Sequence, residues 1–459
     1  MKTFLKILGV LVVAGVAALL AIIFVPPQLT PADKLGPVLA ADWTAPKGAG
    51  EYASQMADCA ACHTADGGQP FAGGREIRSP MGTIYSSNIT PDAKSGIGGW
   101  TLDEFRAALV DGIGRGGVHL YPAMPYENYR KLSEADIRAM YGYFMNEVPA
   151  VDNAVEVTSL KFPFNQRWGI RLWNWMALDA PGFRAESQDE TLKRGEYLVE
   201  GPGHCAACHS PRNLFMAQDG TEGSDPAFLS GGAIDNWTAH DLRGPESGPQ
   251  RWSADELKRY LVSGRNAHAG VAGEMKLVVA DSLQYLTNED ADAMVSYICS
   301  IGTGGAGGAK AAAVDDQKGG TVARLDAAAA SGSTDATARL LTEAKPDLPL
   351  GARLYMDNCN ACHFTDGRGA PNVFPALAGN STVNAPLATG LVHAILFGAE
   401  MPSTITAPQK LRMPGFAGRL SDEEVAALAT FVRSAWGNKA AAVTAADAAA
   451  ERRTPSESD

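Results

Sequence analysis

The chain has almost no cysteine outside one repeated motif. Six of its seven cysteines form three pairs with the spacing CxxC, and a histidine follows each pair at once. The motifs begin at Cys59, Cys205 and Cys359. Cys299 alone lies outside them, on a segment with helical periodicity, and we expect it to be a buried, inert thiol.

Aromatic side chains and basic clusters are also scarce. Phe, Trp and Tyr make up 8% of the chain, so burial must come from small helices packed on something other than large side chains. The formal charge is −12 and no cluster of lysine and arginine occurs, which excludes nucleic acid as a partner. A length of 459 residues predicts about three folding units.

One stretch near the start lacks charge altogether. Ile7–Val25 is an apolar run of 19 residues that ends at two prolines, long enough to cross the hydrocarbon layer of a bilayer. A cleaved signal peptide is the alternative, but its apolar region is normally about 7–15 residues, and the nearest cleavage-like site, around Ala40, is displaced from the run. We therefore expect a membrane anchor, with Lys2 and Lys6 keeping the N-terminus in the cytoplasm and the following chain outside.

The sequence around each motif is repeated as well. A short helical segment precedes each cysteine pair. Thr101 with Glu104 predicts a capping box at the start of a further helix, and the repeat shows the same pattern in Ser253 with Glu256. A last helix closes each repeat, starting near Leu132, Leu286 and Leu420. The repeat is therefore a whole, mostly helical domain.

The CxxCH motif is the attachment signature of haem c. Two thiols one helical turn apart form thioethers with the two vinyl groups of one porphyrin, and the adjacent histidine lies under the iron. A zinc site requires four ligands in tetrahedral arrangement, and a thioredoxin-like dithiol requires a βαβ context, so the sequence favours neither. We predict three covalently bound haem c groups, attached through Cys59, Cys62, Cys205, Cys208, Cys359 and Cys362.

The sixth iron ligand decides what such a haem does. Methionine opposite histidine raises the reduction potential and closes the site for electron transfer, whereas an open position suits peroxide or oxygen chemistry. Loops before the closing helices offer Met124, Met275 and Met413. Met401 is the rival in the third repeat. Histidines form another set of rivals, although each is better explained as solvated or as supporting a ligand: His119, His268 and His393.

The repeats and the haem motifs together predict the organisation of the chain. The expected fold is mostly α, with an N-terminal transmembrane helix followed by three tandem cytochrome c-type haem domains. The expected boundaries are an anchor at 1–28, domain 1 at 42–152, a Trp-rich linker at 153–189, domain 2 at 190–302, a flexible Gly/Ala linker at 303–345, domain 3 at 346–437 and a tail at 438–459.

The three motifs do not stand alone. Together with segments between them they resemble the three-haem cytochrome c subunit of membrane-bound dehydrogenases. Those segments are SPMGTIYSSNITPD from Ser79, YPAMPY from Tyr121, GEYLVEGPGHCAACHSPRN from Gly195, HAGVAGEM from His268 and RMPGF from Arg412. The resemblance covers nearly all of residues 42–437. It implies His63, His209 and His363 as proximal iron ligands, and Met124, Met275 and Met413 as distal ligands.

The same resemblance implies partners and a location. The cytochrome subunit of this family lies on the periplasmic face of the cytoplasmic membrane, beside a large subunit that oxidises alcohols, aldehydes, fructose or gluconate with pyrroloquinoline quinone, flavin or molybdenum. It passes electrons to ubiquinone. Members serving alcohol and sugar dehydrogenases usually attach through C-terminal segments, whereas this chain has its apolar segment first. That difference favours the cytochrome of a molybdenum-containing aldehyde dehydrogenase.

No motif in the chain predicts a site that oxidises an organic substrate, since it has no dinucleotide fingerprint, P-loop or nucleophile constellation. Quinone reduction is the one reaction that could belong to it. Residues 160–178 are the place to look for a quinone site, although we favour an interdomain spacer or subunit contact as the explanation of that stretch. Two other functions remain open at this level: a free-standing electron carrier, and a haem peroxidase if one iron is five-coordinate.

Overall fold

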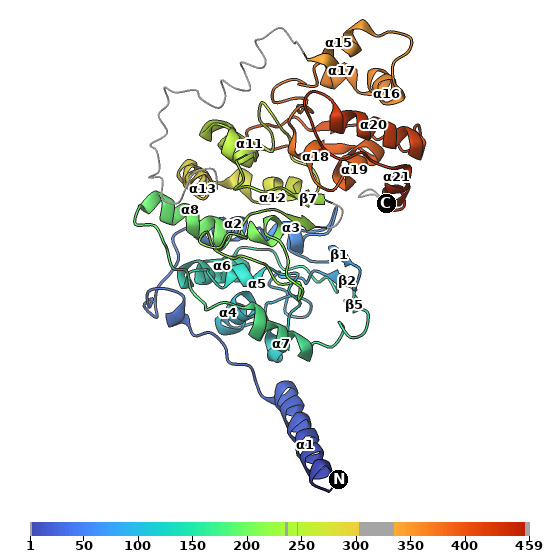
Figure 1. The fold of residues 1–459 in the computed structure, drawn as a ribbon. Helices are drawn as coiled ribbons and strands as arrows, with labels where there is room; N and C mark the ends of the chain where they lie inside the picture. The colour runs from blue at the N-terminus through green and yellow to red at the C-terminus, as the bar shows by residue number, and fades with distance from the viewer. Residues whose placement is uncertain (1, 235–236, 246, 303–334, 455–459) are drawn as a thin grey trace. The chain divides into compact units, whose positions relative to one another are not determined.

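The computed structural model describes residues 2–234, 237–245, 247–302 and 335–454 (Figure 1). The chain packs into two compact units. Unit 1 comprises Met1–Arg184, Glu200–His204 and Arg212–Gln218, and unit 2 comprises Ala185–Val199, Cys205–Pro211 and Asp219–Asp459. The secondary structure is mostly helical, which confirms the predicted class. The division into three tandem haem domains stays a prediction.

Unit 1 combines helices with two small antiparallel sheets. Its helices are α1 (Lys2–Phe24), η1 (Ala32–Lys34), α2 (Ala49–Met56), α3 (Cys59–His63), α4 (Leu102–Asp111), η2 (Arg115–Gly117), α5 (Tyr126–Tyr129), α6 (Glu134–Asn146) and α7 (Trp168–Ala177). Its strands are β1 (Glu76–Ser79), β2 (Gly82–Tyr85), β3 (Ile113–Gly114), β4 (Val118–His119) and β5 (Ser159–Leu160). The sheet order is β1-β2-β5, with Glu76 opposite Tyr85 and Gly82 opposite Leu160, and β3 pairs with β4.

Unit 2 carries two CxxCH motifs. Between residues 185 and 302 the helices are α8 (Glu190–Glu200), α9 (Ala206–His209), α10 (Gly248–Arg251), α11 (Ala254–Ser263), α12 (Met275–Asp281), η3 (Leu283–Tyr285) and α13 (Asn288–Ser300). After residue 334 they are α15 (Ala336–Glu343), α16 (Leu350–Asn358), α17 (Asn360–His363), α18 (Ser381–Asn384), α19 (Thr389–Phe397), α20 (Asp422–Ser434) and α21 (Ala445–Arg452). Two hairpins complete it: β6 (Gly232–Ile234) with β7 (Trp237–Ala239), and β8 (Ala399–Met401) with β9 (Leu411–Met413).

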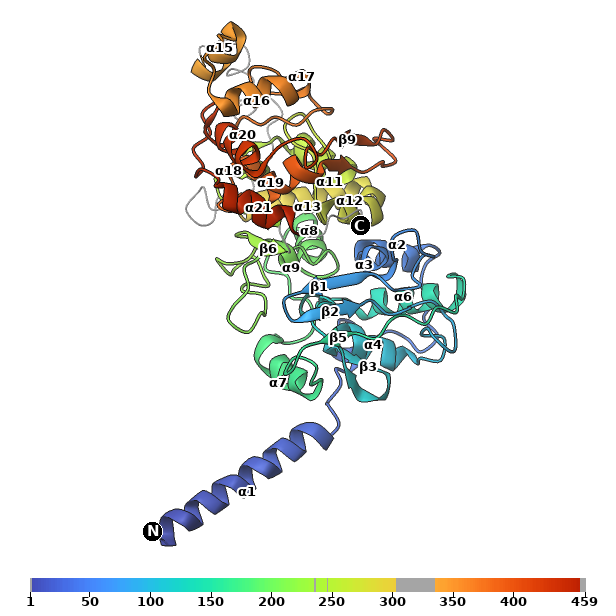
Figure 2. The same ribbon diagram turned by 90° about the vertical axis from the view of Figure 1, so that its right-hand side faces the viewer.

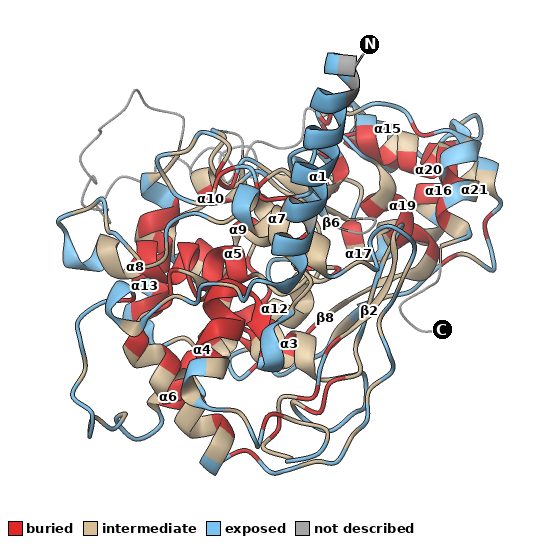
Figure 3. Ribbon diagram, turned by 90° about the horizontal axis from the view of Figure 1, so that it is seen from below, coloured by how far each residue is buried: buried red, intermediate tan, exposed pale blue. Residues whose placement is uncertain are grey.

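Helix α1 contains the predicted apolar run. By length and composition it is able to cross a membrane, and its described side chains are almost all exposed, in contrast to the buried faces of α4 and α5 (Figure 3). An exposed helix of this kind is stable in a lipid environment, where its backbone polar groups are satisfied within the helix. The same features occur in a signal sequence, so length and composition alone leave both alternatives open.

The helix before each motif crosses the closing helix of the same repeat at a glycine. Gly50 of α2 lies against Ala139 and Tyr143 of α6, and an added Cβ would come within 3.0 Å of the Ala139 carbonyl oxygen. The contact recurs twice in unit 2: Gly195 of α8 against Ala293 and Tyr297, and Gly351 of α16 against Ala427 and Phe431. In each repeat, therefore, the backbones of the first and closing helices approach each other at a position where only glycine leaves room.

This crossing gives a prediction for stability. Gly50→Ala should lower the free energy of unfolding of unit 1 by about 1–3 kcal/mol, the usual cost of overpacking. Gly142→Ala is the matched control, because Gly142 lies in α6 with no atom within 4 Å of an added Cβ. Alanine there should be neutral or stabilising by up to about 1 kcal/mol. Denaturant unfolding of the two variants checks the difference, and equal effects would contradict the close crossing.

The predicted helix caps are present, with one difference. Thr101 forms the full capping box with Glu104 at the start of α4. Ser253 accepts a hydrogen bond from the Glu256 backbone, but the Glu256 carboxylate accepts one from the Ala267 backbone instead of returning to the cap. The prediction of a full capping box at Ser253 is therefore wrong for the Glu256 carboxylate, because that carboxylate binds the loop after α11. The closing helices begin after Ser133, Thr287 and Ser421, as predicted.

Segments that the sequence suggested to be linkers or tail are partly packed. The Trp-rich stretch supplies β5 and α7 to unit 1. Of the expected linker at 303–345, residues 303–334 lie outside the described residues, and α15 packs against the hydrophobic core of the third repeat through Leu341. The tail at 438–459 contains α21, whose Ala448 is fully buried in the same core. The alanine-rich composition of this tail concealed its burial, because alanine packs without large apolar surface.

The expectation for Cys299 was wrong. This residue lies near the end of α13 and is exposed, with its Sγ 3.9 Å from the Pro249 carbonyl oxygen. Cys299 follows the buried Ile298 in the last turn of α13, where the side chains are no longer covered by the core.

Candidate haem sites

Each CxxCH motif forms one short helical turn directly after the preceding helix. The three turns are α3, α9 and α17. The chain then folds back in the same way each time, because a backbone N–H donates to the carbonyl of the motif histidine. The donors are Gly73 to His63 at 2.7 Å, Gly231 to His209 at 2.7 Å and Gly369 to His363 at 3.3 Å. The helical turn places both cysteines of a pair on one side.

The imidazole of each motif histidine is held by a backbone carbonyl. His63 Nδ1 lies 2.6 Å from the Ser87 carbonyl oxygen, His209 Nδ1 2.7 Å from that of His240, and His363 Nδ1 2.9 Å from that of Pro375. A carbonyl only accepts, so Nδ1 must carry the proton and donate. This tautomer leaves the Nε2 lone pair for a metal, as second-shell hydrogen bonds do for metal-bound histidines.

Burial favours the neutral forms of the motif side chains. Burial lowers the pKa of His63, His209 and His363, which favours the neutral, ligating imidazole. Burial raises the pKa of the first cysteine in each pair to about 12. Within the described residues, no three His, Cys, Asp or Glu side chains gather into a metal cluster.

Two of the three predicted methionine ligands share a hydrophobic cluster with a motif cysteine. Met124, in the turn before α5, packs with Cys59 against the core of the first repeat. Met413, at the end of β9, packs with Cys359 against the core of the third. Met275 is half-buried as the first residue of α12. The chain thus offers cysteine pairs, histidines with Nε2 available as a ligand, and methionine thioethers. These are the types of group that attach haem c and ligate its iron.

The rival ligands have other surroundings. Met401 lies on β8 with its side chain against Gly270, in the loop of the second repeat. His393 is buried, with its Nδ1 2.8 Å from Glu451 Oε1, and is therefore neither solvated nor free at that nitrogen. His268 stacks on Trp252 with ring centroids 6.1 Å apart. His119 lies on β4, with a buried Nδ1 that has no hydrogen-bond partner among the described residues.

Sequence analysis missed the carbonyl acceptors of the three imidazoles. Ser87, His240 and Pro375 follow their histidines by 24, 31 and 12 residues, so no fixed spacing marks them. In unit 2, His240 has a second contact, since its Nε2 lies 3.3 Å from Thr382 Oγ1 of α18. The acceptor of the second motif is thus linked to the third repeat.

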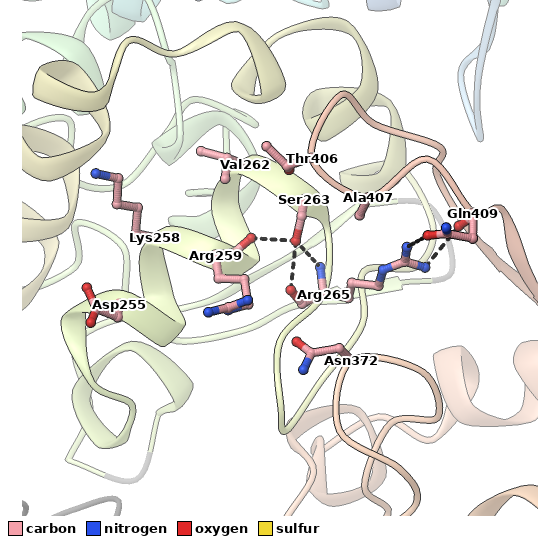
Figure 4. A pocket seen from close by; sticks show the side chains of 10 residues that line it. All are labelled: Asp255, Lys258, Arg259, Val262, Ser263, Arg265, Asn372, Thr406, Ala407 and Gln409. Carbon is pink, nitrogen blue, oxygen red and sulfur yellow. Dashed lines mark hydrogen bonds between the residues drawn. The ribbon is translucent and has the colours of Figure 1, made fainter.

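Unit 2 also has a cavity of about 490 Å³ between α11 and the loops around Asn372 and Gln409 (Figure 4). Arg265 is buried there and donates to the Gln409 carbonyl oxygen at 2.9 Å. None of the predicted haem-attaching cysteines, histidines or methionines lines this cavity, so it forms no part of the candidate haem sites.

The repeated CxxCH turns with carbonyl-held histidines define a c-type cytochrome. Consistent with this, the family described as Cytochrome c matches residues 349–436. The chain is 42% identical to the cytochrome c subunit of a quinone-type alcohol dehydrogenase from Gluconobacter oxydans, over 88% of this chain and 81% of the relative. It is 41% identical to the gluconate 2-dehydrogenase cytochrome c subunit of Pantoea cypripedii, over 88% and 89%. It is 38% identical to the fructose dehydrogenase cytochrome subunit of Gluconobacter japonicus, over 86% and 80%. The chain therefore belongs to the family of dehydrogenase cytochrome c subunits.

Proposed function

We propose that this chain is a membrane-anchored, three-haem cytochrome c that carries electrons from a catalytic dehydrogenase subunit to ubiquinone. The observation that carries the proposal is the threefold recurrence of one arrangement: CxxCH turn, carbonyl-held Nδ1 and glycine helix crossing. Relatives that span most of the chain and are named as cytochrome subunits of alcohol, gluconate and fructose dehydrogenases support the partner.

The residues of the three sites have defined roles in this proposal. The six motif cysteines attach three haem c groups, and when bound, each haem iron accepts and gives up one electron. His63, His209 and His363 ligate through Nε2, with Ser87, His240 and Pro375 fixing the ring orientation. The distal ligands are Met124, Met275 and Met413. A thioether there keeps other ligands out and favours electron transfer over peroxide chemistry.

The contacts of residues 26–42 support retention of α1 as an anchor. Thr30 donates two hydrogen bonds to the Asp111 carboxylate, from its backbone at 2.8 Å and its hydroxyl at 2.6 Å. Leu35 is 2% exposed and belongs to the core of the first repeat. Cleavage near Ala40 would remove both contacts. Retention orients α1 with its lysines in the cytoplasm and places the haem-bearing units in the periplasm.

The catalytic partner supplies the substrate chemistry in this proposal. The partner holds molybdenum, flavin or pyrroloquinoline quinone and oxidises an aldehyde, alcohol or sugar. This chain contributes three haem sites, and its own reaction is limited to passing electrons on to ubiquinone.

Isolation from native membranes tests this function. The membrane is solubilised in mild detergent, the chain is purified by an affinity tag, and the cofactor of any co-purifying large subunit is identified. We expect a molybdenum, flavin or quinone cofactor. A chain that emerges alone with three haems would overturn the dehydrogenase assignment in favour of a free-standing carrier. Carbon monoxide binding to the reduced, undenatured protein would instead indicate a five-coordinate haem of the peroxidase kind.

A further inference from the structure

Large apolar side chains are exposed around α7 in unit 1. Phe162 is 79% exposed, Phe164 52%, Trp175 63% and Met176 60%. We call these four residues the α7 surface. Scattered exposed apolar residues are normal, but four large ones within one short segment indicate a surface that is covered in the working protein.

The opposite side of α7 is already fixed to unit 1. Ile170 is buried, and Asn174 Nδ2 donates to the Asp111 carbonyl oxygen at 3.1 Å. The Tyr126 hydroxyl donates to Asn174 Oδ1 at 3.0 Å, and the Tyr126 ring meets Trp173 edge-on at 6.0 Å. Because these contacts set the rotation of α7, Trp175 and Met176 cannot turn inward without breaking them.

Helix α7 also holds the end of α1. The Arg171 guanidinium donates to the backbone carbonyls of Ile22, at 3.1 Å, Val25 and Pro26. Ile22 lies in the last turn of α1, and Val25 and Pro26 follow the helix directly. Carbonyls at a helix C-terminus have no donors within the helix, so this position favours a cation. Trp175 lies one turn further along α7, with its ring centroid 5.4 Å from the guanidinium carbon. Both views of the ribbon show α7 beside the end of α1 from which the chain continues (Figures 1 and 2).

The length of α1 determines the depth in a bilayer at which Arg171 contacts the end of this helix. An apolar run of 19 residues spans about 28 Å as a helix, close to the roughly 30 Å of hydrocarbon. Val25 therefore marks the outer hydrocarbon boundary when α1 crosses the membrane. Tryptophan is enriched at that level, and arginine extends its charge toward the headgroups.

We propose that the α7 surface lies in the outer headgroup layer of the membrane beside α1 and holds unit 1 against the bilayer. The proposal rests on retention of α1. Charge agrees with phospholipid as the occupant, because residues 161–178 contain Lys161, Arg167 and Arg171 and no acidic residue. Continuity with α1 favours lipid over a protein partner, since Trp175 stacks on the same arginine that closes the transmembrane helix.

Photocrosslinking in native membranes tests the proposal on the full-length chain. A benzophenone amino acid replaces Trp175 in one variant and Phe162 in a second. The control carries it in place of Ile405, which is 69% exposed in unit 2. All three variants must retain the haem content of the parent chain. After irradiation, mass spectrometry identifies the adducts, and the intact mass reports whether α1 is present.

The expected result is phospholipid adducts at positions 175 and 162, several-fold above those at 405. Adducts to another polypeptide, or no lipid adducts at either position in a chain that retains α1, would overturn the α7 proposal and leave the anchor standing. A mature chain whose mass lacks α1 would overturn the anchor and the α7 proposal together. Neither result would alter the test of dehydrogenase function, which depends on the co-purifying subunit.

Discussion

Replacing Cys359 and Cys362 by alanine is expected to remove one haem from the proposed three and to abolish the proposed electron flow from dehydrogenase to quinone. Cys359 and Met413 both pack against the hydrophobic core of the third repeat. Without the thioethers, a haem at this motif would no longer be covalently held. Haem per chain, measured by the pyridine haemochrome spectrum, should fall from three to two.

Cys299→Ala is the matched control for this double variant. Cys299 is exposed on α13 and lies outside the three motifs, so its removal should leave all three haems in place. Full haem content in the Cys359→Ala, Cys362→Ala chain would show that the third motif does not attach haem. A loss of haem in the control would show that the change reflects general misfolding.

The second large effect concerns Met413, the proposed distal ligand of the third repeat. If Met413 ligates the iron, Met413→His should lower the reduction potential of one haem, because imidazole would replace a thioether that stabilises the reduced iron. Axial ligands set haem potentials over a range of about 0.8 V, so the shift should be visible as one displaced step in a spectroelectrochemical titration. The two other steps should stay in place.

Met401→His distinguishes the rival ligand. Met401 lies on β8, paired with β9, and its side chain contacts the loop of the second repeat at Gly270. Histidine there should leave all three potentials essentially unchanged. If Met401→His displaces a step and Met413→His does not, the assignment of the third distal ligand is wrong.

The motif cysteines and histidines stand out in the sequence because haem attachment demands a fixed spacing, and their roles as haem-attaching and iron-ligating residues stay a prediction. Two thioethers and a ligand on one helical turn require CxxCH, whatever the rest of the domain contains. The supporting contacts have no such constraint. The carbonyls of Ser87, His240 and Pro375 reach their histidines across loops of unequal length, so only the folded chain reveals them.

The helix crossings had a signal that could have been used. A glycine precedes each motif at nearly the same distance, as Gly50, Gly195 and Gly351, and a repeated glycine within a helix suggests close backbone approach. The packing of α21 had almost no signal in the sequence. His393 and Glu451 are 58 residues apart in the chain, and the alanines around Glu451 carry no distinctive periodicity. Long-range contact decided the burial of that helix.

Reduction of the haems by substrate tests the central claim most directly. The complex purified from native membranes is mixed anaerobically with a substrate that its catalytic subunit oxidises with an artificial acceptor, and the absorbance of the reduced c-type haem is recorded. We expect substrate to reduce the haems of this chain to nearly the extent reached with dithionite. Haems that stay oxidised, while the same sample still oxidises substrate with the artificial acceptor, would contradict it.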